Sequence, residues 1–96
     1  MSQHFLVEYL QTGSAETREE KRGEHIAYRK SFGNKIILAG PLLGENNKPN
    51  GSVIIIEADD AEAAKAMATN DPFVKAELLK LTSIKAMRVA AVNPPA

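Results

Sequence analysis

The chain has 96 residues, enough for one domain, and its twelve basic and twelve acidic side chains give a formal net charge of zero. A neutral protein has no general attraction for nucleic acid or an anionic membrane, and we expect neither as a partner. The absence of cysteine excludes disulfides, thiolate nucleophiles and thiolate metal sites. Because the apolar runs are short and no secretory-signal pattern is present, we expect a cytoplasmic protein.

The first third of the chain predicts a strand and a helix. Residues 3–10 alternate in a strand-like pattern and are apolar on both faces. A helix is expected over about residues 16–32, capped by Ser14 or Thr17 and followed by Gly33, which suits left-handed termination. The apolar stripe of this helix is thin.

The middle of the chain predicts two strands joined by a hairpin. Residues 35–40 predict a second strand, which Gly40-Pro41 is expected to end. Residues 43–51 are rich in Gly, Asn and Pro and predict the hairpin loop. Residues 52–58 are largely β-branched and predict a third strand that is apolar on both faces.

The last third predicts two helical segments and a strand. An alanine-rich helix is expected over residues 61–69, with one of the two aspartates before it as the cap. A short helix is expected after Pro72, and a fourth strand over residues 83–92, which the preceding segment could extend. Residues 93–96 are expected to form a flexible tail.

This order of elements predicts the α+β class and a ferredoxin-like βαββαβ protomer, with a four-stranded antiparallel sheet and two helices on one face. The first and third strands are apolar on both sides, whereas an uncovered sheet face is normally polar. We therefore expect a homodimer in which the open faces of two sheets meet, and which could assemble further. The alternative is a monomer with a modest apolar patch.

His25 is the first candidate for acid–base chemistry. Helical spacing places it along one side of the expected helix with Arg22, Ile26 and Arg29. A half-buried histidine can transfer protons near neutral pH. A boundary histidine with a structural hydrogen bond would fit the same pattern.

Asp71 is the second candidate, and its position also has a purely structural explanation. Aspartate at the N-cap followed by Pro72 is a favoured helix start. If Asp71 meets His25, however, the carboxylate can orient the imidazole ring and select its tautomer. Gly40 can similarly act as a plain strand end or allow a ligand to approach the backbone.

Other chemistries lack their sequence signals. The chain has no Gly-rich phosphate loop and no nucleophile elbow, and its two histidines, His4 and His25, are far apart in sequence. We expect neither a metal nor a cofactor. RNA-binding modules with this order of elements need aromatic residues on the central strands, which the third expected strand lacks.

Three segments carry a resemblance to a known family. They are RGEHIAYR at residues 22–29, GNKIILAGPLL at 33–43 and GSVIIIEADDAEAAKAMATNDPFVKAEL at 51–78. In this order, Arg-x-x-His, Ala-Gly-Pro, Gly-Ser before an apolar strand and Asp-Pro-Phe are similar to the motifs of the YCII-related (YciI-like) family, over roughly residues 3–90. The resemblance implies a dimeric α+β barrel of ferredoxin-like protomers.

The resemblance also implies a site in a cleft. One characterised type of relative removes chloride from a hydroxylated quinol. By position in the motifs, the implied catalytic residues are His25 and Asp71, and the implied substrate-binding residues are Arg22, Gly40, Pro41 and Phe73.

Three features depart from the family pattern, and one of them is that the C-terminal strand lacks the usual acidic-plus-proline ending. Ala76-Glu77 stands where many relatives have Ala-Gly, and we expect it to place a charged side chain near the mouth of the cleft. The hairpin around residues 44–51 is longer than a compact turn, and we assign it no role.

Two functional hypotheses follow. In the first, the protein is a cofactor-free enzyme, lyase-, dehydrochlorinase- or hydrolase-like, acting on a small polar cyclic or aromatic molecule. His25 would transfer a proton, Asp71 would orient it, and Arg22 would bind an anionic oxygen. In the alternative, the protein is a non-enzymatic dimer that binds a small ligand, or an accessory partner of an enzyme.

Overall fold

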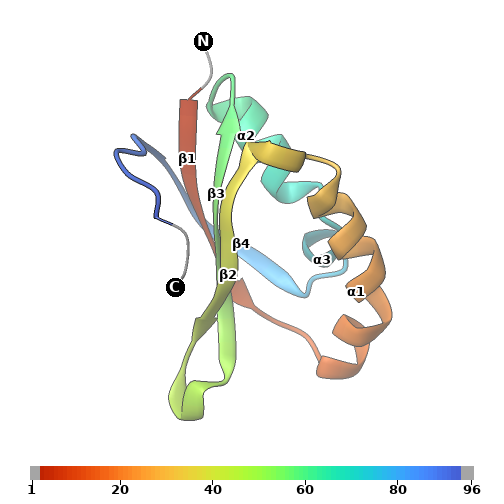
Figure 1. Cartoon of the computed structure of the whole chain (residues 1–96). Coiled ribbons are helices and arrows are strands. Elements are labelled where there is room, and N and C mark those ends of the chain that lie inside the picture. Colours follow the sequence, from red (N-terminus) through yellow and green to blue (C-terminus); the bar gives the residue numbers. More distant parts are fainter. Residues whose placement is uncertain (1–2, 94–96) are drawn as a thin grey trace.

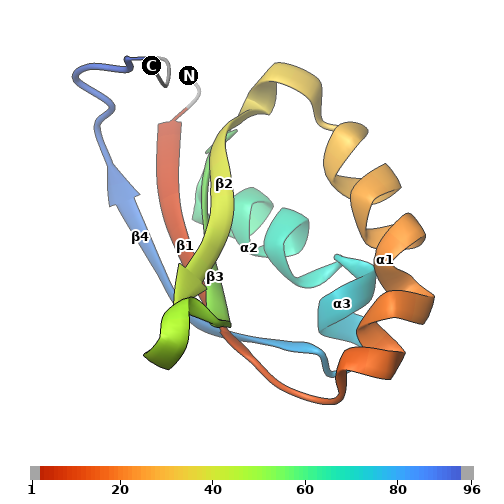
Figure 2. The ribbon, with the colours of Figure 1, turned by 60° about the horizontal axis from the view of Figure 1, so that its bottom comes forward.

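The computed structural model describes residues 3–93, which form a four-stranded antiparallel sheet with the helices on one face (Figures 1 and 2). The strand order β2-β3-β1-β4 is that of the ferredoxin-like fold and confirms the predicted fold class. The elements in chain order are β1 (Gln3–Gln11), α1 (Ala15–Lys30), β2 (Ile36–Leu43), β3 (Pro49–Ala58), α2 (Ala61–Thr69), α3 (Pro72–Lys75) and β4 (Leu79–Met87).

The core lies between the sheet and the helices. Alternation along β1 turns Phe5, Val7 and Tyr9 toward the helices, and all three are buried. The register pairs Phe5 with Ile56 and Val7 with Ile54, so these side chains form one continuous apolar surface. The small residues of α2 allow this helix to pack closely on that surface.

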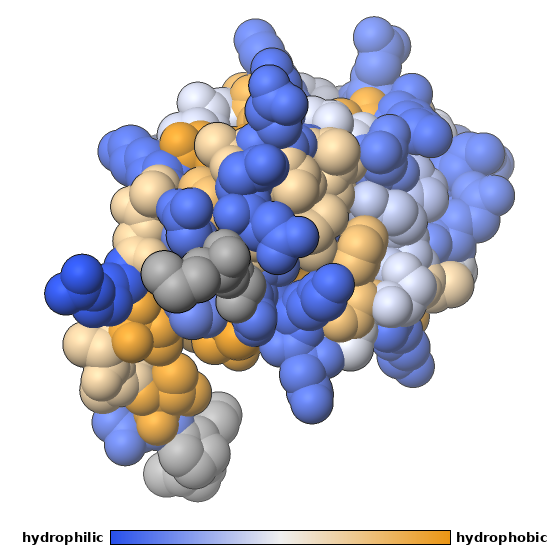
Figure 3. Space-filling model, turned by 90° about the horizontal axis from the view of Figure 1, so that it is seen from above, coloured by the Kyte–Doolittle hydropathy of each residue, from blue (hydrophilic) through white to orange (hydrophobic). Residues whose placement is uncertain are grey.

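The other face of the sheet is also partly apolar, as the sequence predicted. The register places Leu6, Leu38 and Ile55 side by side there, and Leu38 is 51% exposed. Residues 89–93 lie on this side and enclose a cavity of about 220 Å³ with Leu38 and Ile55. Seen from above in Figure 3, the segment that leads to the C-terminus protrudes as a mainly hydrophobic lobe.

The predicted end of the second strand was wrong. The strand continues through Gly40 and Pro41 to Leu43, and Pro41 pairs with Ser52. Proline is tolerated here because β2 is an edge strand. On the outer side of an edge strand no neighbouring strand needs a backbone N–H, so the N–H that proline lacks costs no hydrogen bond there. The hairpin is correspondingly shorter than predicted, because β3 already begins at Pro49.

The predicted bounds of the fourth strand were also wrong. The strand runs over Leu79–Met87 rather than over residues 83–92. Its register with β1 runs from Leu79 opposite Gln11 to Met87 opposite His4, next to Gln3, where β1 begins. Residues 88–93 are not part of a strand. Of the predicted tail, residues 94–96 lie outside the described part of the chain.

Helix α1 differs from a usual amphipathic helix because none of its residues is fully buried. Ser14 caps it by accepting a hydrogen bond from the Thr17 N–H. It packs mainly against α3, and polar contacts help to hold it. The Tyr28 hydroxyl donates to the carbonyl of Met67 at 2.7 Å. The apolar Ile26 is 42% exposed because the helix stands away from part of the sheet.

The short helix α3 is fixed at both ends. Asp71 caps its start, as the sequence predicted, and accepts a hydrogen bond from the Phe73 N–H. At its end the Leu78 N–H donates to the Phe73 carbonyl at 2.7 Å, and Glu77 has a φ of 60°. This is the left-handed helix termination that glycine usually provides.

Candidate active site

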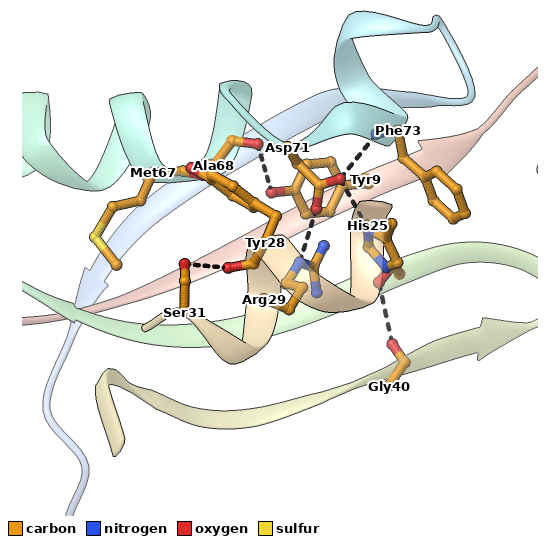
Figure 4. Close-up of polar contacts among 11 residues, drawn as sticks. Tyr9, His25, Tyr28, Arg29, Ser31, Gly40, Met67, Ala68, Asp71 and Phe73 are labelled. Carbon is orange, nitrogen blue, oxygen red and sulfur yellow. Dashed lines mark hydrogen bonds and ion pairs between the residues drawn. The ribbon is translucent and has the colours of Figure 1, made fainter. Parts of the chain in front are cut away.

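The structure brings His25 and Asp71 together although they are 46 residues apart in sequence. The His25 Nδ1 lies 2.8 Å from the Asp71 Oδ1 (Figure 4). The side chain of His25 is 19% exposed, whereas that of Asp71 is fully buried. The contact joins the middle of α1 to the start of α3.

The position of Asp71 follows from local chemistry. Pro72 at the first helical position disfavours helical backbone angles in the residue before it, and Asp71 has φ −60° and ψ 132°. In that conformation the Oδ1 accepts the Phe73 N–H at 2.8 Å while also facing His25. The N-cap role and the contact with His25 are therefore served by the same oxygen.

Arg29 completes the cluster, and the sequence did not identify it as a site residue. Its Nε donates to the Asp71 Oδ2 at 2.8 Å, and its side chain is 14% exposed. Arg29 follows His25 by four residues and so lies on the same side of α1. This spacing was visible in the sequence, but nothing local showed that the two residues share one carboxylate.

Tyr9 lies beneath the arginine. The Arg29 guanidinium carbon is 5.7 Å from the centroid of the Tyr9 ring, a geometry for a cation–π contact. The Tyr9 hydroxyl donates to the Ala68 carbonyl at 2.9 Å, and burial raises the pKa of this phenol. The Arg29 Nη2 is buried and has no hydrogen-bond partner among residues 3–93. Tyr9 thus stays neutral and supports Arg29 from the core side.

The environment of Asp71 favours its ionised form. Burial alone would raise the pKa of this carboxyl group, but hydrogen bonds from His25, the Phe73 N–H and Arg29 outweigh it and hold the pKa below its usual value of 3.8. An ionised carboxylate only accepts hydrogen bonds. The His25 Nδ1 must therefore carry the proton in this contact, and in the neutral ring the Nε2 is left as an acceptor.

Phe73 holds the imidazole ring in place. The two rings are stacked with centroids 4.0 Å apart and an interplanar angle of 1°. Because Phe73 follows the cap by two residues, α3 fixes both the hydrogen-bond partner of His25 and the surface on which its ring rests. The ring is thereby restricted in rotation as well as in tautomer.

A cavity of about 770 Å³ lies between α1 and the β2–β3 part of the sheet, and His25 and Phe73 line it. Its α1 wall also contains the cationic residues Arg18, Arg22, Arg29 and Lys30. Its sheet wall contains the small residues Ala39, Gly40, Gly51 and Ser52 together with Pro41. The size suits a small organic ligand.

Five of the six predicted site residues line this cavity and the sixth contacts one of them, although the roles of all six stay predictions. Arg22, Gly40, Pro41 and Phe73 line it with His25, and Asp71 lies beneath His25. The Arg22 Nε also contacts the Glu19 Oε2 at 3.0 Å. A Cβ atom at Gly40 would meet no protein atom within 4 Å, so packing does not require glycine there.

The expectation for Glu77 was wrong. Glu77 is not among the residues that line the cavity; it follows the last turn of α3, and its carbonyl accepts a hydrogen bond from the Thr12 hydroxyl.

Within residues 3–93, no three His, Asp or Glu side chains are grouped so that they could hold a metal ion. None of the helices described is long and apolar enough to cross a membrane.

In a comparison with protein families, the model of the YCII-related domain matches residues 2–88. Among solved structures, the chain is similar to 5-chloro-2-hydroxyhydroquinone dehydrochlorinase from Burkholderia phenoliruptrix in complex with 2,5-dihydroxybenzoquinone. The identity is 29%, the similarity covers 90% of this chain and 92% of that chain, and the TM-score is 0.72.

A second similar structure belongs to a protein named for the antibiotic biosynthesis monooxygenases, from Chloroflexus aurantiacus. Its identity is 12%, the coverage is 98% of both chains and the TM-score is 0.53, which supports the fold alone. The search of curated proteins found no match.

Proposed function

The chain belongs to the YCII-related domain family, and from that premise and the geometry of the cavity we propose that it is a small dehydrochlorinase-like enzyme that uses His25 as its proton-transfer group. Its substrate would be a small hydroxylated ring that carries a leaving group. The observation that carries the proposal is the bond between the His25 Nδ1 and the buried Asp71, which leaves the Nε2 as the ring nitrogen available to a ligand in the cavity.

The proposed reaction is the net loss of an acid HX. One ring hydroxyl first becomes a ketone as its proton moves to the neighbouring carbon that bears X, which turns tetrahedral. The Nε2 of His25 then takes the proton of a second ring hydroxyl, and the O–H electron pair becomes a C=O bond. The ring double bond shifts toward the tetrahedral carbon, and X leaves as an anion with the electron pair of its bond to that carbon. Asp71 stabilises the imidazolium that forms and keeps the ring oriented. The dehydrochlorinase that shares 29% identity with this chain supports chloride as X.

Other residues are proposed to bind the substrate rather than to transfer protons. Phe73 and Pro41 would contact the ring, and Gly40 would leave space beside it. Arg22 would bind an anionic oxygen, since guanidinium groups form strong charge-assisted hydrogen bonds with such oxygens. Binding to these residues would place the reacting hydroxyl next to His25.

The test uses 5-chloro-2-hydroxyhydroquinone, the compound for which the similar dehydrochlorinase is named. We expect the wild-type protein to release chloride, measured with a chloride-selective electrode, above the spontaneous rate. In His25→Gln, which keeps a side-chain donor for Asp71 but lacks the ring base, the rate should fall by about 100-fold or more.

Lys65→Gln serves as the matched control, because Lys65 lies on the exposed side of α2 and does not line the cavity. It should leave the rate unchanged. Equal rates for the wild type and His25→Gln would contradict the proposed role of His25. Binding of the compound without chloride release would favour the non-enzymatic alternative.

We also propose that the protein works as a homodimer through the open face of the sheet. The support is the row of neighbouring apolar side chains, Leu6, Leu38 and Ile55. No helix within residues 3–93 covers this row, and residues 89–93 leave Leu38 half exposed. Burial of such a surface by a second copy would remove apolar area from water.

A further inference from the structure

We propose that Arg18 and Arg22 form a subsite for a carboxylate on the ligand, at the end of the cavity near the start of α1. The substrate class would then be a hydroxylated ring that bears a carboxylate on a short chain. This inference rests on the proposed function and specifies the ligand of the same cavity.

The charge of the cavity is the first argument. The chain is neutral as a whole, yet Arg18, Arg22, Arg29 and Lys30 line the cavity, and none of the lining residues described is Asp or Glu. Asp71 lies beneath the wall, and its charge is matched by Arg29 at 2.8 Å. The other three cations face the cavity without an acidic lining residue opposite them, which favours an anionic ligand.

The position of Arg18 is the second argument. This side chain is partly buried, and its Nη1 donates to the carbonyls of Thr12 and Gly13 at 2.9 and 3.4 Å. Both acceptors are uncharged, so they hold the guanidinium in place without neutralising it. An arginine fork held in this way suits a carboxylate, which accepts two parallel hydrogen bonds.

Arg22 is the second member of the subsite and is only weakly engaged. Its contact with Glu19 is an exposed pair within one helix, with 58% of the arginine side chain accessible. Such pairs contribute little, because solvent screens them and the side chains lose freedom. A ligand carboxylate held by Arg18 and Arg22 together can therefore compete with Glu19.

The spacing along α1 gives the length of the ligand. At 1.5 Å per residue, Arg22 lies about 4–5 Å and Arg18 about 10 Å from His25 along the helix axis. The opposite wall contains small residues such as Ala39 and Gly51, whose short side chains leave room for a ring. A ring beside His25 and a carboxylate one to two helical turns away fit within the cavity of about 770 Å³.

The experiment compares 4-hydroxyphenylpropionate with its methyl ester, which differs only in the charge and hydrogen-bonding capacity of the carboxylate. Isothermal titration calorimetry should show the acid binding to the wild-type protein about tenfold or more tightly than the ester. Arg22→Gln and Arg18→Gln should each lower this ratio severalfold, and the double variant should bring it close to one. Arg18→Lys, which keeps the charge, should retain part of the preference.

Two further variants separate the subsite from general electrostatics. Glu19→Gln removes the competing carboxylate and should tighten binding of the acid but not of the ester. Lys21→Gln removes a cation of α1 that does not line the cavity and should leave the ratio unchanged. A loss of preference in Lys21→Gln, with none in the arginine variants, would overturn the assignment.

Equal affinities of acid and ester for the wild-type protein, or no detectable binding of the acid, would also overturn it. The proposed function fails by a different result, because it is tested by the dependence of chloride release on His25. Release that depends on His25, together with equal affinities for acid and ester, would reject the carboxylate subsite alone.

Discussion

Asp71 is a single buried carboxylate that serves three donors, namely His25, Arg29 and the Phe73 N–H. Asp71→Asn preserves volume and much of the N-cap but removes the charge that matches Arg29. Because a buried ion left without its partner is costly, we expect the free energy of unfolding at pH 7 to fall by about 3 kcal/mol. Urea denaturation gives this value, and Asp71→Asn combined with Arg29→Met should recover much of the loss.

The same change has a defined pH dependence. The folded-state pKa of Asp71 lies below its usual value of 3.8, so the unfolded chain binds more protons at this group. The stability that Asp71 contributes is fully present above the unfolded pKa and is lost as the pH falls through the folded pKa. The part of the difference between the wild type and Asp71→Asn that comes from ionisation of Asp71 should thus shrink below about pH 4. A difference that grows as the pH falls below about 4 would contradict this explanation.

Among the elements, α3 is the shortest of the α-helices described, yet it positions most of the site, since its cap binds His25 and Phe73 stacks on the ring. Its termination is strained, because Glu77 has a positive φ of 60° where glycine would have no penalty. Glu77→Gly should raise the free energy of unfolding by about 0.5–1 kcal/mol in urea denaturation, since relief of strain exceeds the added freedom of the unfolded chain. Glu77→Ala, which retains a Cβ, should give no such gain, and an equal gain would show that the side chain rather than the backbone is responsible.

At the scale of the whole molecule, the two faces of the sheet have different roles. The helix side holds the core and the cavity, whereas the other side is partly apolar. Figure 1 shows the labelled helices together on the first of these sides. We expect size-exclusion chromatography with light scattering to give a dimer for the wild type. Leu38→Lys would place a charge on the β2 side of the open face, next to Ile55, and should give a monomer, because burying an unpaired charge is unfavourable.

Ala66→Lys is the control for this change, because it adds the same charge on the exposed side of α2, away from the open sheet face. It should remain a dimer. A monomeric wild-type protein at micromolar concentration would reject assembly through the open face, while leaving the cavity and its proposed chemistry as they stand.

Local rules in the sequence were sufficient for the order of elements and for several of their ends. The alternation in β1, the caps at Ser14 and Asp71, and the alanine-rich α2 each depend on residues only two to four positions apart. For this reason the fold class and the bounds of α2 agree with the prediction. Asp71 could be identified as an N-cap from Pro72 alone.

Contacts between distant segments needed the tertiary structure. The bounds of β4 follow from its pairing with β1, which runs antiparallel to it. Pro41 is tolerated within β2 because that strand lies at the edge of the sheet. Arg29 and Asp71 are 42 residues apart, and only the packing of α1 on α3 brings both Arg29 and His25 to one carboxylate. The motifs of the sequence determined which residues could form a site, whereas the distance at which α1 stands from the sheet decided that a cavity lies beside them.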